Sequence, residues 1–173
     1  MFNYPKPVLA IVAYSGTGKT TLLEKVIPIL TKAGYRIATI KHSHHDFEID
    51  KIGKDSDRLR KAGASQVLIT SKYRSALIKE RDGKTEPEFE NEINQLDHSK
   101  LDLVLVEGFR NMDIAKIEVH RSSLKKPLLC EHDDNILALI CDTPPQNKPK
   151  IPTLPLNDIK KINDFIVSFI EKA

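Results

Sequence analysis

Residues 8–20 have the sequence VLAIVAYSGTGKT. The apolar run at 8–13 is typical of a strand covered on both faces, and Gly18-Lys19-Thr20 leads into an apolar helical pattern. Glycines let successive backbone N–H groups point at phosphate oxygens, and the unpaired N–H groups of a helix N-terminus favour an anion. Lys19 would reach the outer phosphates, and the Thr20 hydroxyl would ligate Mg²⁺. The stretch therefore predicts a P-loop that binds a nucleoside triphosphate.

One position departs from the usual P-loop pattern. The first residue of the motif is usually glycine and is Ala13 here. Alanine fits wherever φ is negative, so we expect a tolerated variant.

Length and composition favour one soluble domain. A chain of 173 residues with 40% hydrophobic and 29% charged residues predicts a single P-loop nucleotide-binding domain over 1–173. A net charge of +3 is too small to indicate a nucleic-acid-binding surface by itself. No apolar run has the length of a membrane span, and the N-terminus lacks the apolar region of a signal peptide. Cys130 and Cys141 suit a reducing compartment better than a disulfide framework. We expect a cytoplasmic protein without membrane or nucleic-acid partners.

Strand and helix patterns alternate along the chain. They predict an α/β, three-layer P-loop NTPase fold with a mostly parallel sheet, and an antiparallel strand arm from 66–71 and 74–81. Pro28 should kink or split its helix, and 144–155 should form a proline-punctuated connector. The other expected strands are 8–13, 36–40, 102–106, 116–121 and 136–141, and the expected helices are 19–33, 56–62, 88–96 and 158–172.

A P-loop enzyme also needs a carboxylate on a neighbouring strand to hold Mg²⁺. The run at 102–106 has Asp102 at its start and Glu107 after its end, about 16 Å apart at the usual strand rise. Ligands of open α/β sheets bind outside the carboxyl ends of the strands. We therefore expect Glu107 to act at the metal site, and Asp102 to be a structural acid at the far edge.

Three histidines follow the second expected strand, in Lys41-His42-Ser43-His44-His45-Asp46. The segment is a solvated loop, a transition-metal site, or a switch loop that contacts phosphates, Mg²⁺ or a second, polyanionic substrate. Its position at the nucleotide edge favours the switch loop. Asp46 would then ligate the metal through water or orient the attacking water, as a catalytic carboxylate.

A charged helix is expected to follow this loop. Arg58 and Arg60 either lie on a solvated helical face or face a phosphate group of a partner.

Further motifs make the chain resemble a known family. After the P-loop come Lys41-His42-Ser43-His44-His45, Lys54-Asp55-Ser56, Ala62-Gly63-Ala64 and Leu103-Val104-Leu105-Val106-Glu107-Gly108-Phe109. In this order and spacing, residues from about 8 to 142 resemble the MobB family of molybdopterin-guanine dinucleotide biosynthesis proteins. The resemblance implies GTP binding with Mg²⁺ and weak GTPase activity. It also implies a role in attaching GMP to molybdopterin, the organic part of the molybdenum cofactor, together with the nucleotidyltransferase MobA.

The resemblance also implies a homodimer, for which the arm at 74–81 is the candidate surface because an exposed edge strand can pair. The guanine signature Asn-Lys-x-Asp is absent, and Asp142 is the acid placed to accept from guanine N1 and N2. Base preference therefore depends mainly on the resemblance. Carried over residue by residue, the phosphate cradle is Ser15, Gly16, Thr17, Gly18, Lys19, Thr20 and Thr21.

Rival functions remain open at this point. A metallochaperone GTPase that delivers nickel or zinc shares the P-loop, but the histidine cluster here has no neighbouring cysteine. A small-molecule kinase would need an arginine-rich lid and an acid that binds the acceptor. A non-catalytic GTP-binding adaptor differs from a slow GTPase only in turnover, which the sequence does not reveal.

Overall fold

A computed structural model describes residues 3–43 and 47–173. The chain divides into two compact units, which we call the sheet unit (Met1–His42 and Phe89–Ala173) and the hairpin unit (Ser43–Glu88). The prediction of a single domain over the whole chain stays a prediction. Within the described ranges, no helix has both the length and the apolar character needed to cross a membrane.

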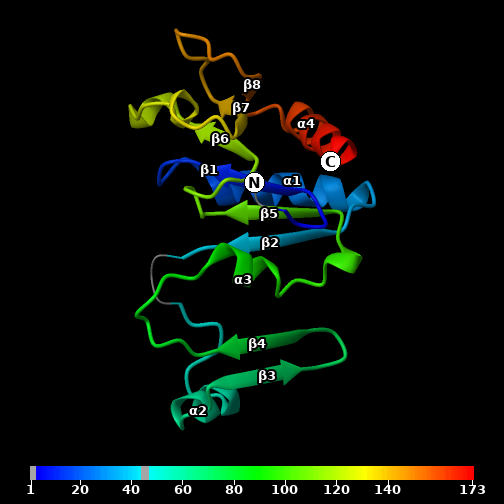
Figure 1. Cartoon of the computed structure of the whole chain (residues 1–173), viewed down its shortest axis with the longest axis vertical. Coiled ribbons are helices and arrows are strands. Elements are labelled where there is room, and N and C mark those ends of the chain that lie inside the picture. The colour runs from blue at the N-terminus through cyan, green and yellow to red at the C-terminus, as the bar shows by residue number, and fades with distance from the viewer. Residues whose placement is uncertain (1–2, 44–46) are drawn as a thin grey trace. The chain divides into compact units, whose positions relative to one another are not determined.

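The sheet unit is built on six parallel strands in the order β2-β5-β1-β6-β7-β8 (Figure 1). The central strands are apolar because both of their faces are covered, as the sequence predicted. All six strands run the same way, so their carboxyl ends meet at one edge of the sheet. The strands are β1 Val8–Val12, β2 Ile37–Lys41, β5 Leu103–Glu107, β6 Lys116–His120, β7 Ile136–Cys141 and β8 Thr153–Pro155.

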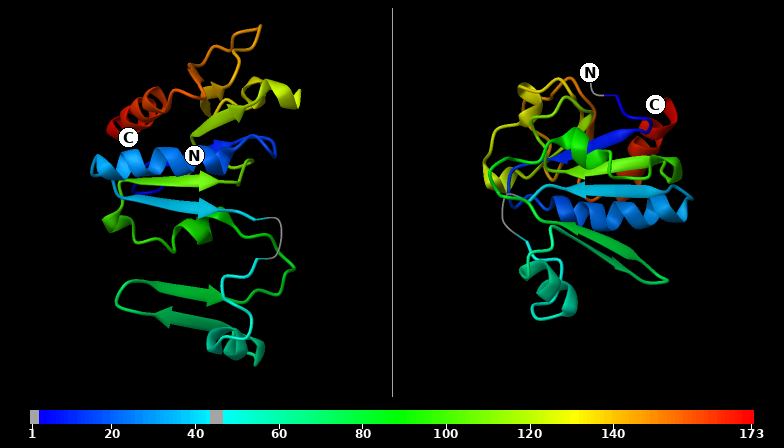
Figure 2. Two further views of the ribbon diagram at one scale, coloured as in Figure 1. Left: turned by 180° about the vertical axis from the view of Figure 1, so that it is seen from behind. Right: turned by 60° about the horizontal axis from the view of Figure 1, so that its bottom comes forward.

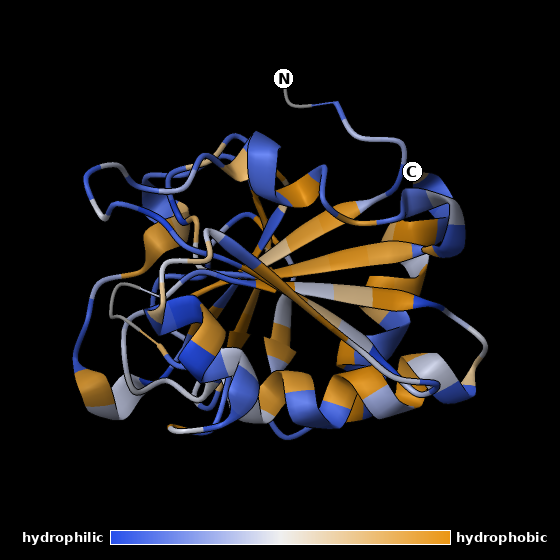
Figure 3. Cartoon of the chain, turned by 90° about the horizontal axis from the view of Figure 1, so that it is seen from below, coloured by the Kyte–Doolittle hydropathy of each residue, from blue (hydrophilic) through white to orange (hydrophobic). Residues whose placement is uncertain are grey.

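Helices cover both faces of this sheet (Figure 2). α1 (Lys19–Lys32) and α4 (Ile159–Lys172) pack on the face that carries Leu9 and Ile11. α3 (Phe89–Ile93) and the 3-10 turn η3 (Leu129–Glu131) pack on the opposite face. Apolar residues are concentrated in the strands between these layers (Figure 3). The remaining 3-10 turns are η1 His98–Lys100 and η2 Ser122–Leu124.

Two details of the sheet unit differ from the prediction. β8 forms inside the expected connector, because an edge strand tolerates the proline at its end, Pro155. The predicted split of α1 at Pro28 does not occur, because Pro28 is exposed and lies ten residues into a continuous helix of 14 residues, and the kink stays a prediction. Solvent can satisfy the carbonyl that loses its partner there. The α/β fold, the parallel sheet and the antiparallel arm are confirmed.

The hairpin unit contains α2 (Asp55–Lys61) and the antiparallel pair β3 (Gln66–Thr70) and β4 (Ser75–Lys79). Arg60 forms ion pairs with Asp57 and with Glu80, both at 3.2 Å, and also contacts Glu48. Asp57 is buried and accepts from the Gly53 backbone N–H, which lowers the pKa of its carboxyl. The Arg60 charge is therefore engaged inside its own unit, whereas the Arg58 side chain is 75% exposed.

Asp102 lies immediately before β5, at the opposite end of this strand from Glu107. Its carboxylate accepts from Arg36 Nε at 2.9 Å, from Arg36 Nη2 at 2.8 Å and from the Arg36 backbone N–H at 2.8 Å. These bonds to Arg36 hold the pKa of Asp102 well below its usual range. The two residues tie the start of β2 to the start of β5.

We expect Asp102→Asn to lower the melting temperature by a few degrees at pH 7, because a charge-assisted fork becomes a weaker neutral contact. The pKa of Asp102 is lower in the folded chain than in the unfolded one. Its stabilisation is therefore complete above about pH 4 and is lost as the pH falls below that value. Between pH 4 and pH 2 the variant should lose stability less steeply than the parent, as measured by circular dichroism melts. Equal slopes would contradict this account.

Candidate functional site

The loop between β1 and α1 has the backbone of a phosphate cradle. Gly16 (φ +81°) and Gly18 (φ +91°) are in the left-handed region, which side chains rarely adopt. Thr17 is buried, and its hydroxyl donates to the Tyr14 carbonyl at 3.0 Å. Among the described non-glycine residues, only Phe109 and Lys125 have positive φ, so Ala13 fits without strain, as expected.

Lys19 places its ammonium group over this loop. Its Nζ donates to the carbonyls of Ala13 at 3.3 Å and Tyr14 at 3.4 Å. Burial lowers the pKa of Lys19, while the nearby Glu107 carboxylate acts to raise it. These two contacts hold the ammonium over the loop that precedes α1. The N-terminus of a helix favours an anion, so the ammonium and the helix can act on the same phosphate.

Thr20 and Glu107 meet where α1 begins and β5 ends. The Thr20 hydroxyl is 3.2 Å from both Oε1 and Oε2 of Glu107, and Lys41 Nζ is 3.8 Å from Oε1. The parallel register, which sets Glu107 beside Ile11 of β1, produces this approach. One hydroxyl and one carboxylate are a donor set that suits Mg²⁺, which usually keeps several waters and takes few protein ligands.

Gly108, directly after Glu107, allows a close approach between the ends of β5 and β2. It has φ +103°, and a Cβ there would lie 2.7 Å from the Cβ of His42. The His42 backbone N–H donates to the Glu107 carbonyl at 2.8 Å, and its ring stacks on Phe109 with centroids 4.5 Å apart. The first histidine of the cluster is thus packed beside the candidate metal acid.

The rest of the cluster cannot be placed in the same way, because His44, His45 and Asp46 lie outside the described residues. No group of three metal-ligating side chains occurs in the part of the chain that the structure describes. The roles of Asp46 and of the cluster therefore stay predictions.

Arg121 is a residue of the site that sequence reasoning missed. It follows β6, and its Nε donates to the Thr17 carbonyl at 2.7 Å. Its Nη2 would lie 3.5 Å from a Cβ at Gly18. Within the described residues, its terminal nitrogens have no hydrogen bond. The available signal was a cation at the carboxyl end of a central strand, the edge where phosphate binds.

The other predicted residues lie around the same edge. Ser15 and Thr21 are exposed on either side of the cradle. Asp142 follows β7, and its Oδ1 accepts from the backbone N–H groups of Ser122 at 3.0 Å and Thr143 at 2.8 Å. These bonds lower the pKa of its carboxyl. The structure brings Lys19, Thr20 and Glu107 together and gives Asp142 a role in fixing two loops.

Comparison with known proteins places these motifs in a family. The family described as "MobB: Molybdopterin guanine dinucleotide synthesis protein B" matches residues 8–142. A protein of Escherichia coli (strain K12) is 43% identical over 167 residues, which cover 96% of this chain and 94% of that protein. One of Haemophilus influenzae is 42% identical over 97% of this chain and 92% of its own length. Both are named molybdopterin-guanine dinucleotide biosynthesis adapter protein.

Solved structures agree with the fold. A crystal structure of molybdopterin-guanine biosynthesis protein B (mobB) has a TM-score of 0.74 at 29% identity and covers 95% of this chain and 99% of its own. A MobB homolog from Bacillus stearothermophilus, at 23% identity, has a TM-score of 0.72 over 96% of this chain and 99% of its own.

We expect Glu107→Gln to weaken the affinity of the nucleotide-bound protein for Mg²⁺ about tenfold. The amide keeps the shape of the side chain and loses its charge. Titrations of Mg²⁺ at fixed nucleotide concentration measure this. Asp102→Asn, at the other end of β5, is the matched control and should leave this affinity unchanged. The reverse pattern would contradict the assignment of Glu107, because it would place the metal at the Asp102 end of β5.

We expect Arg121→Ala to weaken triphosphate binding about tenfold, because the Thr17 carbonyl loses a charged donor that holds the cradle. Isothermal calorimetry measures the change. Arg74→Ala removes the same charge from the β3–β4 turn and serves as the control. Equal affinities for the parent and Arg121→Ala would remove Arg121 from the site.

Proposed function

The chain belongs to the MobB family, and from this premise we propose that it is a GTP-binding adapter with weak GTPase activity. It would assist the attachment of GMP to molybdopterin in the synthesis of molybdopterin guanine dinucleotide. The observation that carries this proposal is the approach of the Thr20 hydroxyl to both Glu107 oxygens at 3.2 Å, beside Lys19 and the glycine cradle. This arrangement supports binding of a magnesium–triphosphate complex.

Different residues of the site would bind the phosphates, the metal and the base of the nucleotide. The backbone of the cradle and the hydroxyls of Thr20 and Thr21 would donate to phosphate oxygens, and Lys19 would neutralise the outer phosphates. Thr20 and Glu107 would hold Mg²⁺, which supplies positive charge to the β- and γ-phosphates when bound. Asp142 would accept from the guanine edge. Asp46 would orient water for the slow hydrolysis.

The two relatives are named adapter proteins, which supports an adapter role rather than rapid turnover. The partners we propose are GTP, molybdopterin and the nucleotidyltransferase MobA. We also propose a homodimer formed through the β3–β4 hairpin, where Leu68 is 65% exposed, Tyr73 78% and Leu77 48%. Large exposed apolar side chains on an edge strand favour pairing with another chain.

A metallochaperone role gains no support from the cysteines. Burial and the neighbouring Glu118 carboxylate raise the pKa of the Cys130 thiol to about 12. Metal ligation needs the thiolate, so Cys130 is a poor ligand at neutral pH. Cys130 is half-buried and Cys141 is buried, and burial raises the pKa of the Cys141 thiol as well.

Lys19→Ala tests the proposal directly. Removing the ammonium over the cradle should weaken Mg²⁺–GTP binding roughly ten- to hundredfold, the cost of a lost charge-assisted contact of about 1.5–3 kcal/mol. Calorimetry with GTP and ATP, in the presence of Mg²⁺, measures both the loss and the base preference. The melting temperature shows whether the variant folds.

Unchanged GTP affinity in a folded Lys19→Ala variant would overturn the P-loop assignment. Preference for ATP over GTP in the parent would overturn the guanine assignment. Turnover measured with and without the nucleotidyltransferase then separates a slow GTPase from an adapter that does not hydrolyse GTP.

A further inference from the structure

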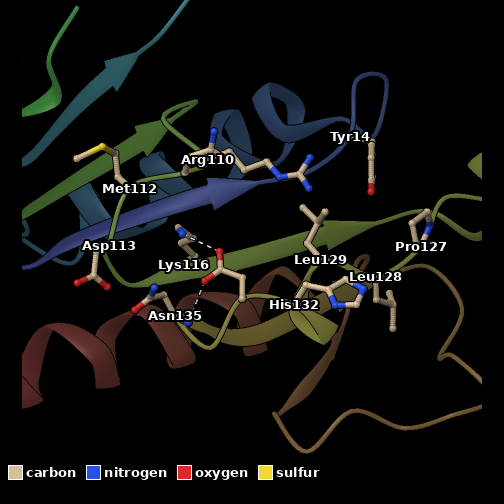
Figure 4. Close-up of a pocket in the computed structure, with 12 residues that line it drawn as sticks. Tyr14, Arg110, Met112, Asp113, Lys116, Pro127, Leu128, Leu129, His132 and Asn135 are labelled. Carbon is tan, nitrogen blue, oxygen red and sulfur yellow. Dashed lines mark hydrogen bonds and ion pairs between the residues drawn. The ribbon is translucent and has the colours of Figure 1, made fainter. Parts of the chain in front are cut away.

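A second polar cavity lies beside the phosphate cradle, on the sheet face opposite α1. It has a volume of about 330 Å³ and is lined by Tyr14, by the segment 110–113 after β5, by the start of β6 and by the segment 127–135 (Figure 4). Cavities of this size hold small ligands, and convergent polar groups fix the orientation of such ligands. None of the nucleotide contacts proposed above uses its side chains.

The lining of this cavity contains an ion pair with a buried lysine. The Lys116 side chain is 2% exposed, and its Nζ donates to Asp133 Oδ2 at 2.7 Å. An ammonium group has three N–H donors, and this is the one hydrogen bond that Lys116 Nζ makes within the described residues. Burying an ammonium is costly unless its donors are satisfied. The remaining N–H groups therefore suit an acceptor on a ligand in the cavity.

The rim next to the cradle combines an aromatic ring with two cations. The Arg110 guanidinium carbon lies 5.2 Å from the centroid of the Tyr14 ring, and Lys126 Nζ lies 5.8 Å from it. Both cations are exposed, and in Figure 4 the Arg110 side chain extends toward Tyr14. A phosphate group can bind such cations while a planar ring lies near Tyr14.

The opposite wall offers an apolar surface and an amide. Leu128 and Leu129 are buried side chains that line the cavity, as does Asn135. A side-chain amide has both donors and an acceptor, so it can pair with the edge of a heterocycle that presents both. The cavity is thus suited to a flat, polar molecule with an anionic group.

We propose that this cavity binds a phosphate monoester carried on a planar nitrogen heterocycle, the chemical class of the pterin substrate. This inference rests on the proposed function, because it assigns a place to the second substrate. Arg110 and Lys126 bind the phosphate, and Tyr14 and Leu128 pack on the ring. Lys116 donates to an acceptor on the ring, and Asn135 pairs with the ring edge. Since the Tyr14 carbonyl accepts from Lys19 Nζ, one residue borders both the cradle and the cavity.

The test uses the full chain saturated with Mg²⁺–GTP, so that the cradle is filled. The probes are 6-hydroxymethylpterin phosphate, unphosphorylated 6-hydroxymethylpterin and GMP, and binding is followed by calorimetry. We expect one-to-one binding of the pterin phosphate, with both other probes about tenfold weaker. Arg110→Ala should weaken the pterin phosphate about tenfold and leave GTP affinity within about twofold.

Two further variants sharpen the result. Lys172→Ala removes a positive charge from the exposed last turn of α4 and should leave every affinity unchanged. Lys116→Met removes the buried ammonium and should weaken the pterin phosphate as well. If Lys116→Met does not fold, the Arg110→Ala variant still decides the test, because Arg110 is exposed.

Each contrary outcome has its own meaning. Equal affinities for the phosphorylated and unphosphorylated pterin overturn the inference. An unchanged affinity in Arg110→Ala also overturns it, as does the absence of binding by every probe. Preference for GMP assigns the cavity to a nucleotide and also overturns it. A parent chain that binds the pterin phosphate but not GTP would overturn the proposed function and leave the cavity assignment standing.

Discussion

The parallel pairing of β1 with β5 on one side and β6 on the other is the constraint on which the rest of the structure depends. The register sets Ile11 beside Glu107 and Val12 beside Glu118, so the ends of three strands are fixed relative to one another. The glycine loop follows β1, the candidate metal acid Glu107 ends β5, and Arg121 follows β6. A slip of one residue in either pairing would turn these side chains to the wrong face.

β6 shows how buried polar groups hold the second face of this sheet together. Its residues alternate between apolar Ile117 and Val119, which pack with α1 and α4, and polar Lys116 and Glu118 on the other face. The buried Glu118 carboxylate accepts from the backbone N–H groups of Leu129 and Cys130, both at 2.9 Å. Those two bonds attach η3 to the sheet. The wall of the second cavity is therefore held by hydrogen bonds as well as by apolar packing.

Much of the fold was predictable because its signals are local. The apolar runs of β1 and β5 and the glycines of the cradle each depend on neighbouring residues, and their elements formed as expected. Glu107 and Asp102 could be told apart because strand direction alone separates the two ends of β5. β8 was missed because its proline, Pro155, argues against a strand unless its edge position is known.

The parts of the site that the sequence did not reveal are long-range. Arg121 and its acceptor, the Thr17 carbonyl, are 104 positions apart in the chain. The one local signal, a cation at the end of an expected strand, does not identify that acceptor. Likewise, Lys116 and Glu118 in an alternating strand predict a solvated face. Only the fold shows that Asp133 and η3 cover that face. Whether such polar side chains are buried depends on residues that are distant in the sequence, and sequence periodicity does not identify those residues.

Tyr14 lies between the phosphate cradle and the second cavity. Its backbone carbonyl accepts from Thr17 Oγ1 and Lys19 Nζ, and a carbonyl can do so whatever the side chain is. Its ring faces Arg110 and Lys126 instead. The P-loop pattern leaves this position unspecified, because only the backbone there is needed for the phosphate. The variable positions of the loop are therefore free to shape a neighbouring cavity, while the glycines and Lys19 keep the cradle intact.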